Sequence, residues 1–195
     1  MHELVGWLGF AFVGTVTPGP NNAVLWASGL RFGFSRTLPH VLGTALGMGT
    51  LVVGVAAGIG ALLEAVPRAE LLLKLVGSAY LLYLALRIAG GGAAGRAEVS
   101  RPLRLWQAAA FQYANPKAWL FTVAAVGTFL PPGLSRPVGV AVLDATLMTV
   151  VVATAAVWAA GGAALDRLVA DRRASRAVSV ALAVLLAASV AFIWA

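Results

Sequence analysis

The stretch Thr-Pro-Gly-Pro-Asn-Asn, residues 17–22, lies in the middle of an apolar run that extends from Glu3 to Arg31. A membrane-spanning helix needs about 20 mostly apolar residues, so this run is long enough to cross a bilayer. Proline removes a backbone donor and clashes with the preceding helical turn. Lipid cannot satisfy the polar groups that are freed in this way. The stretch therefore predicts a membrane helix that is broken at Pro18 and Pro20.

A second break of the same kind follows about half a chain later. Residues 115–117 read Asn-Pro-Lys and lie within the apolar run from about Leu105 to Leu130. Placing Pro20 on Pro116 gives an offset of 96 residues in a chain of 195. A single proline is more often an ordinary kink, but two matched breaks beside Asn favour a pair of discontinuous helices. Such pairs are typical of transporters built from inverted repeats.

The composition excludes most soluble classes of protein. Hydrophobic residues make up 61% of the chain and charged residues 11%, and the mean hydropathy is +0.91. Soluble domains have roughly 45–50% apolar and about 25% charged residues, so this chain has too little polar surface for a soluble globule. The chain has no Cys and two His. We therefore expect no disulfide, no metal site and no cofactor.

Six apolar runs are long enough to be membrane spans. The sequence thus predicts an all-α integral membrane protein with six transmembrane helices, the first helix of each half being broken at Pro. The runs lie between residues 3 and 31, 36 and 64, 71 and 89, 105 and 130, 137 and 164, and 177 and 195. A polar linker at 90–104 separates a first three-helix repeat (1–89) from a second (105–195). Because each half has an odd number of spans, the two repeats are expected to be inverted relative to each other.

The basic residues predict the orientation. With six spans, ten of the fourteen Lys and Arg fall on the side of the linker, three fall on the side of the termini, and Lys117 lies within a span. Lys and Arg concentrate on the cytoplasmic face, so both termini are predicted to be outside. The net charge of +7 is then a signal of topology, and no nucleic-acid partner is expected.

Several of these segments together resemble the LysE/RhtB family of amino-acid exporters. The resemblance rests on Pro-Gly-Pro-Asn at 18–21, Gly-Leu-Arg-Phe-Gly at 29–33, His-Val-Leu-Gly at 40–43 with Gly47, and Asn-Pro-Lys-Ala at 115–118. It covers essentially the whole chain. The resemblance implies an exporter of amino acids or close derivatives in the plasma membrane, coupled to the proton gradient.

The candidate substrate site follows from the two breaks and the intramembrane charges. Lys117 and Asp144 are charged groups within spans, which makes them functional candidates by default, although they could also form a structural ion pair. We expect a substrate carboxylate at the half-helix amino termini with Lys117, and a substrate ammonium at freed carbonyls and Asn amides. The predicted binding residues are Pro18, Gly19, Pro20, Asn21, Asn22, Asn115, Pro116, Lys117 and Asp144. Related exporters often have an acid about two turns beyond Asp144, where this chain has valines at 150–152, so the resemblance assigns no proton-coupling role to Asp144.

Other interpretations remain open at this stage. The chain could export another small solute or a cation, although a cation site would be short of ligands. A membrane-embedded enzyme is disfavoured because there are no paired carboxylates, no His cluster and no Gly-x-Ser-x-Gly motif. A structural partner without transport would leave the two matched breaks unexplained.

Three smaller features also have two interpretations each. The glycines Gly43 and Gly47 favour packing within the chain over a homodimer, which the sequence leaves open. The histidine at position 40 favours a capping or interfacial role over a proton relay. Several polar residues either line a pathway or join helices, namely Gln107, Gln112, Thr15, Thr17, Thr122 and Thr128.

Overall fold

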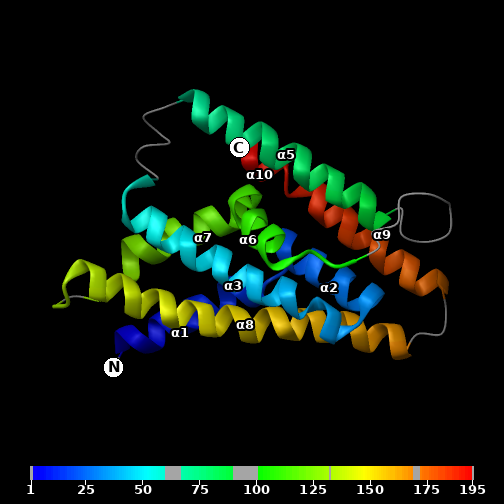
Figure 1. Cartoon of the computed structure of the whole chain (residues 1–195), viewed down its shortest axis with the longest axis horizontal. Coiled ribbons are helices and arrows are strands. Elements are labelled where there is room, and N and C mark those ends of the chain that lie inside the picture. Colours follow the sequence, from blue (N-terminus) through cyan, green and yellow to red (C-terminus); the bar gives the residue numbers. More distant parts are fainter. Residues whose placement is uncertain (1, 60–66, 90–100, 132, 169–171, 195) are drawn as a thin grey trace.

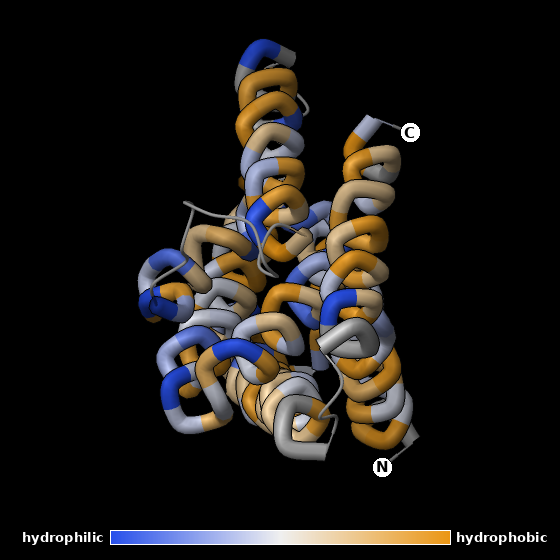
Figure 2. Tube along the Cα trace, turned by 90° about the vertical axis from the view of Figure 1, so that its right-hand side faces the viewer, coloured by the Kyte–Doolittle hydropathy of each residue, from blue (hydrophilic) through white to orange (hydrophobic). Residues whose placement is uncertain are grey.

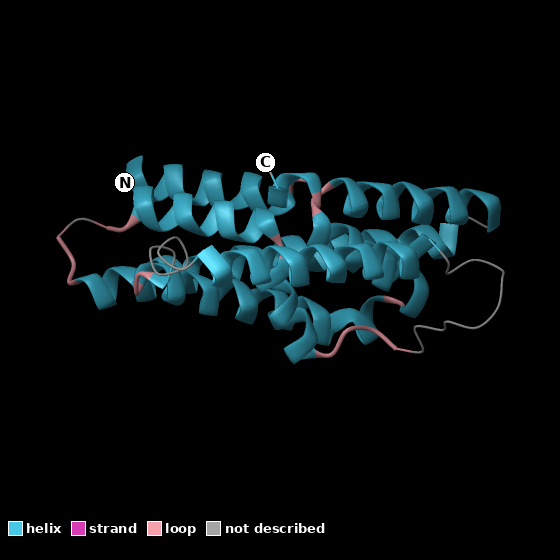
Figure 3. Ribbon diagram, turned by 90° about the horizontal axis from the view of Figure 1, so that it is seen from above, coloured by secondary structure: helices cyan, strands magenta, loops and turns pink. Residues whose placement is uncertain are grey.

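The computed structural model describes residues 2–59, 67–89, 101–131, 133–168 and 172–194. Every regular element in these residues is a helix, which confirms the all-helical prediction. Seen from above, the helices run roughly along one common axis (Figure 3). Most of the predicted linker, at 90–100, lies outside the described residues, so the division into 1–89, 90–104 and 105–195 stays a prediction.

The helix boundaries follow the prolines closely. The described helices are α1 (His2–Val16), α2 (Pro20–Phe32), α3 (Phe34–Ala56), α5 (Pro67–Ala89), α6 (Leu105–Ala114), α7 (Pro116–Phe129), α8 (Arg136–Leu168), α9 (Arg172–Ala188) and α10 (Ala191–Trp194). Both α2 and α7 have proline at the first helical position. The missing N–H of proline has no intrahelical partner to lose at that position. Helices α2 and α7 thus begin at Pro20 and Pro116, and the interruption of a single membrane span at each of these points stays a prediction.

Helices from the two halves of the chain pack against each other (Figure 1). Helix α8 packs along both α1 and α2, and helix α3 packs along both α6 and α7. In addition, α3 packs against α8, and α5 packs against α9. We call the end of the bundle where α2 ends and α3 begins the Gly33 side, and the end where α3 ends and α8 begins the Ala56 side. At the Ala56 side, Arg136 Nη2 donates a 2.8 Å hydrogen bond to the Ala56 carbonyl.

Glycines allow the closest of these approaches. A Cβ added at Gly43 or Gly47 of α3 would collide with the backbone of α6, at Leu105 and Ala109 respectively. Small residues at this spacing let two helix backbones come into contact. The interpretation of Gly43 and Gly47 as packing within the chain is confirmed.

The described helices have an apolar exterior, and polar side chains are buried among the apolar residues of the core. Large apolar side chains are exposed along α1, α5, α7, α8 and α9, and Figure 2 shows hydrophobic residues along most of the helices. Ten polar side chains are buried in α2, α3, α6, α7, α8 and at the α6–α7 junction: Asn21, Asn22, Ser28, Thr37, His40, Thr44, Gln112, Asn115, Thr122 and Thr154. Soluble proteins rarely expose so much apolar surface, so this exterior is the one expected of a protein surrounded by lipid.

Helix length supports the membrane prediction only in part. Among the described residues, α3 and the segment Arg136–Leu165 of α8 are each long and apolar enough to cross a bilayer as single helices. The first and fourth predicted spans are each divided between two shorter helices, α1 with α2 and α6 with α7. The number of six spans stays a prediction.

Candidate functional site

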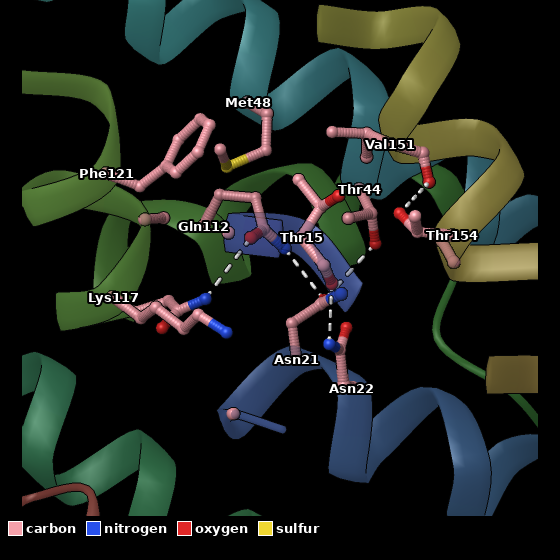
Figure 4. A pocket seen from close by; sticks show the side chains of 15 residues that line it. Thr15, Asn21, Asn22, Thr44, Met48, Gln112, Lys117, Phe121, Val151 and Thr154 are labelled. Atoms are coloured by element: carbon pink, nitrogen blue, oxygen red, sulfur yellow. Dashed lines mark hydrogen bonds between the residues drawn. The ribbon is translucent and has the colours of Figure 1, made fainter. Parts of the chain in front are cut away.

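A pocket lies where the α1–α2 junction and the α6–α7 junction face each other (Figure 4). Residues of α1, α2, α3, α6, α7 and α8 line it. With its open mouth it has an empty volume of about 440 Å³. Part of this space is open to solvent, so the pocket is a cleft at the two junctions and not an enclosed cavity.

Two helix amino termini converge on the pocket. The first residues of α2 that reach it are Asn21 and Asn22, and the first of α7 are Lys117 and Ala118. Backbone N–H groups at the start of a helix have no intrahelical acceptor, and the helix dipole makes this end positive. The two termini together form a site suited to an anion such as a carboxylate.

A network of buried amides holds one wall of the pocket. Asn21 Oδ1 accepts a hydrogen bond from Gln112 Nε2 at 2.9 Å and another from Thr44 Oγ1 at 3.2 Å. Asn115 Nδ2 donates to Gln112 Oε1 at 3.4 Å. The network joins α2, α3 and α6 with the α6–α7 junction, so all four segments depend on it for their relative positions.

A second set of hydrogen bonds closes the α1–α2 junction. Asn22 Nδ2 donates to the carbonyls of Thr15 and Thr17, both at 2.8 Å. Thr15 belongs to the last turn of α1 and Thr17 follows the end of the helix, so neither carbonyl has a further helical N–H to bind it. The Asn22 amide thus satisfies groups that lipid could not satisfy.

Lys117 connects the two junctions. Its Nζ donates to the Thr17 carbonyl and to Thr17 Oγ1, both at 2.7 Å, and to the Pro18 carbonyl at 3.4 Å. The Lys117 stem covers Gly19, where an added Cβ would lie 2.8 Å from Lys117 Cδ. The backbone at Gly19 is extended, so the need for glycine there is steric. The positive ammonium lies at the negative carboxyl end of α1, where the helix dipole favours it.

The remaining walls offer one free acceptor and an apolar surface. Asn115 Oδ1 is buried and has no hydrogen-bond partner among the described residues. The side chains of Met48, Phe121 and Val151 line the pocket opposite Asn22 (Figure 4). The pocket therefore combines an anion site, an acceptor for a donor group and a surface for an apolar side chain.

The structure brings together most of the predicted site, but not Asp144. Gly19, Asn21, Asn22, Asn115 and Lys117 line the pocket, and the predicted prolines Pro18, Pro20 and Pro116 flank it.

Asp144 lies instead between α8 and α3, where its Oδ1 would be 2.9 Å from a Cβ added at Gly49. This oxygen has no hydrogen-bond partner among the described residues. Because the Lys117 ammonium is bound to Thr17 and Pro18, the alternative of a Lys117–Asp144 ion pair is not found in the described part of the chain.

Some site residues were not singled out by the sequence. Gln112 and Thr15 had two interpretations there, and Thr44, Met48, Phe121, Val151 and Thr154 were not considered. The available signal is weak, since Gln112 is an amide in an apolar helix one turn before Asn115. His40 is also not what the sequence favoured, because it is fully buried and neither ring nitrogen is hydrogen-bonded to a described residue.

Comparison with known proteins agrees with the resemblance seen in the sequence. The model of the family described as LysE type translocator matches residues 12–193. Proteins named cysteine/O-acetylserine efflux protein from Escherichia coli strain K12, Shigella flexneri serotype 5b and Shigella sonnei are each 33% identical over 181 residues. The matches cover 91% of this chain and 90% of each relative. No solved structure matches the chain significantly.

Proposed function

The chain belongs to the family of LysE-type translocators, and we propose that it exports small neutral amino acids or their derivatives across the plasma membrane. It is a transporter and not an enzyme. The observation that carries the proposal is the pocket between the α1–α2 and α6–α7 junctions.

The lining of the pocket supports a zwitterion with a short, uncharged side chain. The substrate carboxylate binds the amino termini of α2 and α7. Its ammonium donates to Asn115 Oδ1, the buried acceptor described above. Its side chain packs against Met48, Phe121 and Val151. No carboxylate is among the described lining residues, which disfavours a substrate with a second ammonium group. The relatives are named for cysteine and O-acetylserine, which have this general form.

The packing of the helices supports two inverted repeats. In such a repeat, α1 and α2 correspond to α6 and α7, α3 corresponds to α8, and α5 corresponds to α9. The contacts of α8 with α1 and α2 then correspond to those of α3 with α6 and α7, and the pairs α3–α8 and α5–α9 each join two corresponding helices. Transporters of this kind bind substrate near the midplane between the repeats and expose it alternately to each side.

The distribution of Arg residues supports an orientation of the chain in the membrane, and with it the direction of transport. Several described arginines lie toward the Gly33 side. They are Arg31 at the end of α2, Arg36 at the start of α3, Arg87 at the end of α5 and Arg104 at the start of α6. We assign this side to the cytoplasm, with both termini outside. Export against a concentration gradient needs an energy source, and we propose proton antiport, on the basis of the resemblance to the family.

Counterflow in proteoliposomes tests the substrate class. Vesicles that contain the purified chain and are loaded with an unlabelled amino acid are expected to accumulate the same labelled amino acid from outside. We expect the highest rates for O-acetylserine, cysteine and serine, and rates at least about tenfold lower for lysine and glutamate, since an unpaired charge in the apolar subsite is costly. Vesicles without protein are the control. Equal rates for lysine and serine would contradict the proposed class, and no counterflow with any amino acid would contradict the function.

A further inference from the structure

The His40 side chain is 0% exposed, yet neither of its ring nitrogens has a hydrogen-bond partner among the described residues. A neutral imidazole has one N–H donor and one acceptor nitrogen. Leaving a buried polar group unpaired costs about 1–3 kcal/mol. An apolar side chain of similar size would avoid this cost, so packing alone does not explain a histidine at this position.

His40 lies between two polar contacts that join α2 to α3. On one side, Ser28 Oγ and Thr37 Oγ1 are 3.0 Å apart. On the other side, Thr44 Oγ1 donates to Asn21 Oδ1 in the wall of the pocket and also to the His40 carbonyl. One helical turn, or about 6 Å, therefore separates His40 from the pocket along α3. His40 lies on the cytoplasmic side of the pocket in the proposed orientation.

The part of the bundle around this turn is closed. Thr37 and Val41 of α3 are at most 1% exposed, as is Leu25 of α2, which belongs to the same core cluster as Val41. An amino acid cannot pass here unless the helices separate. A proton needs only a water molecule as carrier, which makes it the ligand that suits an unpaired imidazole in a closed region.

No described contact supplies a counter-charge to His40. Helices α2, α6, α7 and α8 pack against α3, and their ionisable residues are Arg31, Tyr113, Lys117, Arg136, Asp144, Asp166 and Arg167. Of these, Lys117 is bound to Thr17, Arg136 to Ala56, and Asp144 lies at Gly49. The Arg31 guanidinium lies over Phe32, and the Tyr113 ring contacts Trp119. On α3 itself, Arg36 is exposed one turn before His40.

We propose that His40 is the proton-binding site that couples inward proton movement to outward movement of the amino acid, an inference that rests on the proposed export function. A proton that enters from outside through the pocket adds to the lone pair of the unprotonated ring nitrogen and forms an imidazolium with two N–H groups. An unpaired charge in this closed region is costly. Separation of α2, α3 and α6 on the cytoplasmic side relieves the cost by admitting water. The imidazolium then releases one proton to the cytoplasm and becomes neutral again.

The backbone next to His40 is suited to such a movement. Pro39 lies inside α3 and has no N–H to donate to the carbonyl one turn earlier. Helices bend most readily at such positions. The first turn of α3 can therefore move relative to the rest of the helix when His40 becomes charged.

Comparing two transport assays tests the proposal with the full chain in proteoliposomes and labelled O-acetylserine as the probe. The first assay is counterflow without a pH gradient, and the second is uptake into vesicles that are acidic inside. His40→Gln keeps a polar side chain but cannot titrate near neutral pH. We expect it to retain counterflow within about twofold and to lose gradient-driven uptake by about tenfold, because only the second assay needs a proton-carrying group. The matched control is His2→Gln, which alters the other histidine and is expected to behave as the wild type.

The other outcomes are equally informative. Gradient-driven uptake that survives in His40→Gln would overturn the proposal. Equal loss of both assays in His40→Gln and His40→Asn, with both variants monodisperse in detergent, would also overturn it, since His40 would then act in substrate passage. Wild-type protein with counterflow but no response to the gradient would overturn the coupling alone, whereas wild-type protein without counterflow would overturn the proposed function.

Discussion

Replacing Lys117 by methionine is expected to reduce amino-acid counterflow by about 100-fold or more. The Met side chain still covers Gly19, but the ammonium that binds the Thr17 and Pro18 carbonyls is lost. Hydrogen bonds to charged groups contribute about 1.5–3 kcal/mol each, and each 1.4 kcal/mol corresponds to a factor of about ten. The α1–α2 junction then loses these hydrogen bonds to α7, and the two helix amino termini are no longer held together at one carboxylate.

The chain offers a matched control for this substitution. The other lysine of the chain is Lys74, which lies in α5, outside the lining of the pocket. Lys74→Met removes the same charge and is expected to keep counterflow within about twofold, because Lys74 is not among the residues that line the pocket. Counterflow by Lys117→Met at the wild-type rate, at equal amounts of protein in the vesicles, would show that Lys117 has no role in transport.

Replacing Asn21 by alanine is expected to reduce both stability and transport. The change removes the acceptor that Gln112 Nε2 and Thr44 Oγ1 share, so each donor keeps only its bond to a carbonyl of its own helix, Ala108 and His40 respectively. A hydrogen bond contributes about 0.5–1.5 kcal/mol net, so the unfolding temperature in detergent should fall. The α2 amino terminus also loses its fixed position at the pocket, and we expect counterflow to fall by about 30-fold.

A triple variant separates the two effects of Asn21→Ala. Adding Gln112→Leu and Thr44→Val removes both donors as well, and removing both partners of a hydrogen bond is nearly neutral for stability. Gln112→Leu also removes the acceptor of the bond from Asn115 Nδ2, so the unfolding temperature should recover only in part. Counterflow should not recover, because the polar wall of the pocket is absent. Recovery of both would mean that the Asn21 network only stabilises the fold.

The features that the sequence predicted well are local ones. Proline acts on its own helix, so the residues at the two junctions were found from residues 17–22 and 115–117 alone. Lys117 was found because a charge within an apolar run is conspicuous. The family was also identified from short motifs such as these, because several of them occur together along the whole chain in the order typical of the family.

The features that were not predicted from the sequence depend on which helices pack against each other in the fold. Gln112 and Thr44 meet Asn21 only because α3 and α6 come into contact through Gly43 and Gly47. Spacing along one helix does not say what lies opposite.

The same limit applies to the charged residues and to His40. Lys117 was expected at the substrate carboxylate, whereas its ammonium is bound to the end of α1. Asp144 was grouped with the site because it is charged, although it lies on a face of α8 that packs against α3. His40 was favoured as an interfacial residue because Pro39 precedes it near a helix start, while its burial depends on the helices that pack against α3.

The central claim is that the substrate occupies the pocket between the two junctions, and protection of a single introduced cysteine tests it most directly. The chain has no Cys, so Thr15→Cys places the sole thiol in the wall of the pocket, and Leu134→Cys places it in an exposed segment outside the pocket. At ten times its dissociation constant, O-acetylserine leaves about a tenth of the sites free. O-acetylserine at this concentration is expected to slow the reaction of Thr15→Cys with a water-soluble methanethiosulfonate about tenfold, and to leave the reaction of Leu134→Cys unaffected. An unchanged rate at Thr15→Cys, in vesicles that transport O-acetylserine, would contradict the account.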